Sequence, residues 1–169
     1  MNIDNANKNV IDFYKDLKPI VDEVVSKNAR PIDEIIKKIK KDLTTLTNKE
    51  LQDYMLQLSI ETYYFATIKD SSILRQECAT VLLKEGQANS FNGADGTQSY
   101  RNNQAIIQNL DKQAVNVLYN AVVNCMKSKL DEAHRIVNVL SSVLISKNAE
   151  AKLKGVQSDD IYDNTNSEN

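Results

Sequence analysis

The sequence has few of the residues that make turns, metal centres and catalytic sites. Among 169 residues there are 4 glycines, 2 prolines, 2 cysteines, 1 histidine and no tryptophan. β-Sandwiches and glycine-rich phosphate loops need more turn residues than this. A zinc site needs about four ligands, which Cys and His mostly supply. We therefore expect no all-β fold, no metal and no cofactor.

Long apolar runs and a strong net charge are also missing. No run approaches the roughly 20 apolar residues that cross a bilayer, and no signal peptide follows Met1. Lys and Arg number 21 against 23 Asp and Glu, which excludes a strongly basic, histone-like chain. Cys78 and Cys125 each lie in an apolar-periodic stretch, so we interpret them as buried thiols in a reducing compartment. We expect a cytoplasmic protein without membrane contact.

Apolar residues at spacings of three and four run through nearly the whole chain, which is typical of amphipathic helices. Residues 8–27 predict a helix that Pro19 kinks or splits, and a second helix is predicted from Pro31. Thr47 and Glu50 predict a capping box at the start of a third helix, which extends to about residue 90. The sequence 70–72, Asp-Ser-Ser, is either a new cap or a polar patch on that helix.

Residues 92–96, Asn-Gly-Ala-Asp-Gly, predict the clearest loop in the chain. One or two long helices are predicted over residues 99–153, and Asp111 is the residue that could cap a fresh start. A nearly continuous apolar seam from Val115 to Leu144 suits a helical hairpin or coiled coil. The predicted fold class is all-α: an elongated helical bundle or hairpin with a long C-terminal helix. Because the seam is long, we expect uncovered apolar surface and a homo-oligomer.

The predicted organisation has three parts. Residues 1–46 hold the N-terminal helices, and residues 47–155 form a helical core with its loop near 92–98. Residues 156–169 contain four acids and no Lys or Arg, so we predict a disordered acidic tail. Residues 1–157, which precede the four acids of this tail, carry a net charge of about +2.

No catalytic constellation is present in the sequence. His134 lies nine positions after Cys125, so the two are not on adjacent helical turns. Asp131 and Glu132 point about 100° apart on a helix and do not converge as an acid/base pair. The two glycines of the loop lack the Lys and the preceding strand of a phosphate loop. We expect no catalytic residues and no enzymatic activity.

Two basic clusters are the remaining candidates for binding. The first comprises Lys27, Arg30, Lys37, Lys38, Lys40 and Lys41, and the second comprises Lys127, Lys129, Arg135, Lys147, Lys152 and Lys154. A solvated helix face is the simpler interpretation of each cluster, and contact with nucleic-acid phosphates is the alternative. Tyr100 and Arg101, beside the loop, are candidates for exposed stacking on bases. Core packing is the more frequent role for Tyr63 and Phe65.

The order of these features resembles the UvsY-type recombination mediator family of tailed phages. The resemblance covers roughly 100 residues, from Leu51 to about Lys154, and rests on order and spacing rather than on a diagnostic motif. It is carried by Tyr63-Tyr64, Val81-Leu82-Leu83-Lys84, the loop Asn92-Gly93-Ala94-Asp95-Gly96 and Lys129-Leu130-Asp131-Glu132-Ala133-His134-Arg135. Residues 1–46 and the tail have no placed counterpart, and the mild overall acidity departs from a DNA-binding chain.

The resemblance implies a non-enzymatic accessory protein of phage recombination and replication. Such mediators are small helical proteins that form rings and bind single-stranded DNA. They work beside a single-strand binding protein and load a recombinase. Carried onto this chain, the expected DNA contacts are Lys84, Tyr100, Arg101, Lys112, Lys127 and Lys129. The competing hypothesis is a helical phage structural, scaffold or host-interaction protein that binds only protein.

Overall fold

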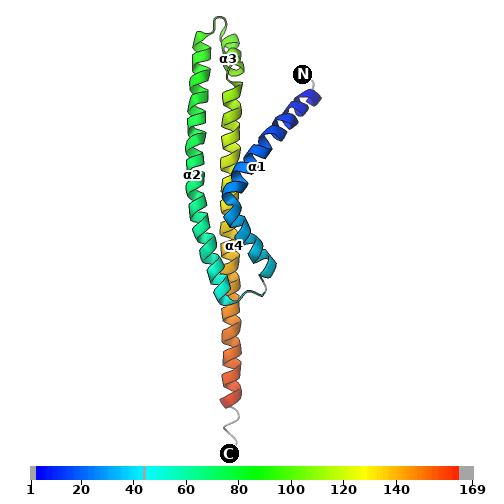
Figure 1. The fold of residues 1–169 in the computed structure, drawn as a ribbon, viewed down its shortest axis with the longest axis vertical. Coiled ribbons are helices and arrows are strands. Elements are labelled where there is room, and N and C mark those ends of the chain that lie inside the picture. Colours follow the sequence, from blue (N-terminus) through cyan, green and yellow to red (C-terminus); the bar gives the residue numbers. More distant parts are fainter. Residues whose placement is uncertain (1–2, 44, 164–169) are drawn as a thin grey trace, which may run out of the picture. The chain divides into compact units, whose positions relative to one another are not determined.

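The computed structural model describes the backbone of residues 3–43 and 45–163, and the side chains of residues 10–43 and 45–153. Within these residues the chain forms four helices and no strand, which confirms the all-α prediction. The helices in chain order are α1 (Ile3–Asp42), α2 (Asn48–Gly93), α3 (Gln98–Ile107) and α4 (Leu110–Asp163) (Figure 1).

The chain divides into two compact units that each combine separate segments. Unit 1 contains Met1–Arg30 and Tyr63–Leu130, and unit 2 contains Pro31–Thr62 and Asp131–Asn169. The predicted division at residues 46 and 155 differs from this, because α1, α2 and α4 each contribute residues to both units.

Helix α1 is continuous where the sequence predicts two helices. Proline in a helix interior costs roughly 3 kcal/mol, because it lacks an N–H and crowds the preceding turn. Buried residues on either side of Pro31 oppose this cost, since Ala29 is 0% and Ile32 is 1% exposed. Packing of the apolar face therefore outweighs the local helix-breaking signal.

The predicted capping box begins α2, as the spacing of Thr47 and Glu50 indicated. The Thr47 backbone N–H donates to Glu50 Oε2 at 2.7 Å, and the Glu50 N–H donates to Thr47 Oγ1 at 3.2 Å. The bond from the Thr47 backbone N–H, followed by that from its hydroxyl, lowers the pKa of the Glu50 carboxyl. Both orphan donors at this helix start are thereby satisfied.

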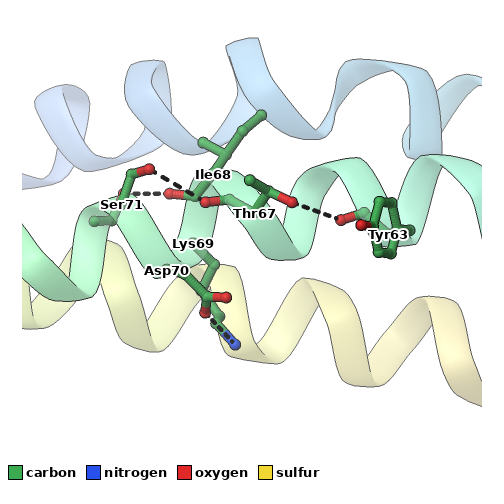
Figure 2. Close-up of polar contacts among 7 residues, drawn as sticks. Tyr63, Thr67, Ile68, Lys69, Asp70 and Ser71 are labelled. Atoms are coloured by element: carbon green, nitrogen blue, oxygen red, sulfur yellow. Dashed lines mark hydrogen bonds and ion pairs between the residues drawn. The ribbon is translucent and has the colours of Figure 1, made fainter.

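Helix α2 continues through Asp70-Ser71-Ser72, so this segment is a polar patch and not a new cap. The Ser71 and Ser72 hydroxyls donate to the carbonyls of Thr67 and Ile68, at 3.3 and 3.1 Å. These bonds turn the hydroxyls back onto the helix and leave its ladder intact. Figure 2 shows the Ser71 and Thr67 hydroxyls in this arrangement.

The structure agrees with the predicted loop at residues 92–96 and with the helices predicted over residues 99–153. Helix α2 ends at Gly93, and Gly96 has a φ of 117°, a conformation that favours glycine. Thr97 caps α3 and accepts from the Tyr100 N–H at 3.3 Å. Residues 99–153 form two helices, and the break falls at 108–109, two residues before Asp111. Helix α4 extends to Asp163, so residues 156–163 are helical where the sequence predicts a disordered tail. Residues 164–169 of that predicted tail lie outside the described residues.

Most of the predicted seam on α4 is covered within the chain. Its fully buried members include Val122, Met126, Ala133 and Leu140, with exposures of 0–3%. Val115 is 46% exposed. The seam is therefore largely core, and most of the large apolar side chains that remain exposed lie outside it.

Candidate interaction surfaces

Arg101 closes the α2–α3 turn and does not form the exposed contact that the sequence predicts. Its Nε–H donates to the Phe91 carbonyl at 2.9 Å, and its guanidinium carbon lies 4.1 Å from the Phe91 ring centroid. A guanidinium over an aromatic face is an attractive geometry. Tyr100 is 52% exposed and its ring lies over Gly96. Of this pair, Tyr100 is the residue that presents its side chain to solvent.

A buried polar cluster, which sequence reasoning missed, joins α2 to the α3–α4 junction. Asn109, 2% exposed, donates to Ser90 Oγ at 3.0 Å and to the Ala105 carbonyl at 2.9 Å, and accepts from Lys112 Nζ at 3.0 Å. Gly86 of α2 leaves the space for this cluster, because a Cβ there would clash with Asn109 Oδ1 and Lys112 Nζ. A glycine inside a long helical pattern is the one available signal.

Two further polar contacts join α2 to α4 in unit 1. The Gln76 amide donates to Asn120 Oδ1, and the Thr80 hydroxyl donates to Asn116 Oδ1 at 2.8 Å. Partly buried amides of this kind favour one register between packed helices, because a slip would leave them unpaired. In unit 1, polar contacts therefore favour one register between α2 and α4, in addition to the packing of the apolar core.

The predicted DNA-contact residues differ in exposure and in the contacts that they make within the chain. Lys84 on α2 and Lys127 on α4 are exposed. Lys112 and Lys129 are half-buried, and Lys112 is bonded to Asn109. The 24 residues from 86 to 109, around the loop, contain Arg101 and one acid as their only charged groups. Unit 1 as a whole has 12 Lys and Arg against 10 Asp and Glu.

The basic residues of α1 give the densest positive surface in unit 2. Lys37, Lys38 and Lys41 are exposed, on the side of α1 away from buried Ile36 and Ile39. Lys40 is turned to α4, where its Nζ lies 3.5 Å from Glu132 Oε1. We call Lys37, Lys38 and Lys41 the α1 basic face.

Lys147 of the second basic cluster and its neighbour Asn148 form hydrogen bonds within unit 2. Lys147 Nζ on α4 donates to the Leu46 carbonyl before α2. The neighbouring Asn148 accepts from the Asn48 amide at 2.8 Å. Lys147 therefore fixes the chain between α1 and α2 against α4, which leaves fewer charges of this cluster for a ligand.

Several apolar residues are exposed where the sequence predicts burial. Tyr63 is 72% and Tyr64 61% exposed, whereas Phe65 is 2% exposed, so core packing is correct for Phe65 and wrong for Tyr63. Cys78 and Cys125 are free thiols and both are exposed, which corrects their interpretation as buried. In total, 22 large apolar side chains are exposed among those the structure describes. Such extensive apolar exposure is typical of an interaction surface.

Within the described part of the chain, no group of three or more His, Cys, Asp or Glu side chains could hold a metal ion. None of the helices there has a stretch long and apolar enough to cross a membrane. Comparison of the chain with protein-family models, curated proteins and solved structures finds no match.

Proposed function

We propose that the chain is a non-enzymatic, self-associating helical protein that binds single-stranded DNA and assists a recombinase and a single-strand binding protein. The observation that carries the DNA part is the α1 basic face, which presents three lysines within five residues. The partner proteins come from the resemblance to UvsY-type mediators alone.

Self-association gives this modest basic surface its physical sense. One chain offers few exposed lysines and is close to electroneutral, so a single copy is a weak DNA ligand. An oligomer repeats the same face in each copy, and a DNA strand that meets several faces binds by avidity. We therefore expect DNA affinity to depend on protein association as well as on salt.

The test uses a labelled oligonucleotide and fluorescence anisotropy at low and moderate salt. Lys37→Gln/Lys41→Gln is expected to weaken binding at least tenfold at low salt and to flatten the salt dependence. The matched control is Lys15→Gln/Lys49→Gln, which removes two exposed lysines that lie outside both basic clusters. This control is expected to change affinity much less.

A protein-only function is the second candidate, and the nearly uncharged 86–109 region favours it. A protein without residues 156–169 would lack four acids that oppose phosphate binding. If this shortened protein does not bind a long oligonucleotide even at low ionic strength, the DNA proposal fails and the protein-only function replaces it.

A further inference from the structure

An uncovered apolar stripe runs along α2 in unit 1. Its members are exposed and follow one another at separations of three or four residues: Tyr63, Thr67, Ser71, Leu74, Cys78 and Val81. The opposite side of α2 holds buried Phe65, Ser72 and Ala79 and the contacts to α4. Helix α2 therefore has two faces fit for packing, and the chain itself covers one of them.

The Thr67 and Ser71 hydroxyls of the α2 stripe are already satisfied by their own helix. Thr67 Oγ1 donates to the Tyr63 carbonyl and Ser71 Oγ to the Thr67 carbonyl, each at 3.3 Å (Figure 2). Asp70, at the edge of the stripe, is paired with Lys69 at 3.2 Å. Burying the stripe against an apolar partner would therefore leave the Thr67 and Ser71 hydroxyls with their acceptors.

A groove of about 440 Å³ opens between α1 and α4, also within unit 1. Its apolar lining includes Val10, Phe13, Tyr14, Val117, Ala121 and Cys125. A second pocket of about 310 Å³ shares Phe13 and Val117 and extends the groove to Leu110. The charged lining residues, Lys18 and Asp22, are bonded to each other, so the α1/α4 groove is apolar with a neutral charge balance.

The α2 stripe and the α1/α4 groove are similar in length, the stripe has no charged member, and the two charged residues of the groove are paired with each other. The stripe is a convex row about 27 Å long and the groove extends about 22 Å along α4, at about 1.5 Å per residue. Taking about 200 Å² for a whole tyrosine, Tyr63 alone exposes on the order of 150 Å². Leu74 and Val81 add to this, and the stripe thus supplies about half of the roughly 800 Å² that each partner buries in a stable interface.

We infer that the α2 stripe of one copy of the chain packs into the α1/α4 groove of a second copy. This rests on the self-association in the proposed function and specifies its surfaces and polarity. The two surfaces lie on different elements of the same unit, and the inferred contact is heterologous: each copy offers its stripe to one neighbour and its groove to another. Each copy keeps one free stripe or groove until further copies add, and the assembly closes into a ring or grows as a filament.

Complementation between two variants tests this polarity. Leu74→Glu places a charge on the stripe, and Phe13→Glu places one in the groove. Each variant alone is expected to associate at least tenfold more weakly than the wild type in sedimentation velocity. A mixture of the two restores one intact stripe and one intact groove, so a 1:1 dimer is expected. Gln57→Glu, at an exposed polar position of α2, is the control and should associate like the wild type.

Two results would overturn the inference. An oligomer that persists in both variants places the interface elsewhere. Two monomeric variants that stay monomeric on mixing, with wild-type circular dichroism, indicate a contact that uses one surface twice or another occupant of the groove. DNA binding is measured separately on the wild type, because the variants are expected to lose avidity. A wild type that does not bind the oligonucleotide although the complementation succeeds refutes only the proposed function, and a wild type that binds although the complementation fails refutes only this inference.

The two native cysteines give a second test without a disruptive change. Cys78 lies in the stripe and Cys125 lines the groove, and the chain has no other cysteine. A series of bismaleimides of increasing span is expected to join the wild type into a ladder beyond dimers. Cys78→Ser and Cys125→Ser should each abolish the ladder, and their mixture should yield one dimer band. Dimers that form in Cys125→Ser alone would show two stripes in contact and overturn the heterologous arrangement.

Discussion

Gly86→Ala separates the effect of helix propensity from that of the buried polar cluster. Alanine in a helix interior is favoured over glycine by about 1 kcal/mol, so propensity alone predicts a more stable protein. The new Cβ would instead displace Asn109 and Lys112. Asn109 is 2% exposed and makes three hydrogen bonds, and an unsatisfied buried amide costs about 1–3 kcal/mol. Overpacking adds about 1–3 kcal/mol.

The net expectation is a loss of about 2 kcal/mol, which corresponds to a fall in melting temperature of about 4–8 °C. Urea unfolding followed by far-UV circular dichroism, at one fixed protomer concentration, measures it. Gly93→Ala is the matched control, since no atom lies within 4 Å of its added Cβ, and we expect little change or a slight gain. Wild-type or higher stability of Gly86→Ala would refute the role assigned to the cluster. Adding Asn109→Ala should make the two losses less than additive.

Three further changes test separate parts of the account. Glu50→Gln should flatten the acid limb of the curve of stability against pH. Because folding lowers the pKa of Glu50, its contribution to stability is present above its unfolded pKa and is lost as the pH falls through its folded pKa. An unchanged acid limb would refute the capping role. Arg101→Lys keeps the charge but should cost about 1 kcal/mol in urea unfolding, because the Phe91 contacts are lost; full stability would return Arg101 to the exposed candidates. Leu74→Glu should lower oligonucleotide affinity at least tenfold although it is not a phosphate contact, since avidity is lost; undiminished affinity would separate DNA binding from association.

The helical elements were predictable because their signals are local. The 3–4 spacing, the Thr47 and Glu50 box and the glycine-rich loop each act within a few residues, and the structure has all three. The prediction of a helix break before Pro31 was wrong. The burial of the apolar face keeps α1 continuous there, and local helix propensity does not include this packing.

The candidate surfaces were less predictable, because they depend on which face of each helix is covered. Apolar spacing alone predicted that Tyr63 and Cys78 are buried, whereas both lie on a second apolar side of α2 that is exposed to solvent. Arg101 is adjacent to the loop in sequence, but its partner Phe91 lies across the turn, ten residues earlier. Such pairings follow from tertiary contacts and have no spacing rule of their own.

The most direct measurement is sedimentation velocity of the full chain with a fluorescent single-stranded oligonucleotide at low salt, detected at both the protein and the dye wavelengths. The account predicts that the oligonucleotide sediments with a species containing several protein copies, and that added salt releases the DNA before the protein dissociates, because phosphate contacts are more salt-sensitive than apolar burial. Free oligonucleotide beside a monomeric protein would contradict both the DNA proposal and the self-association on which it depends.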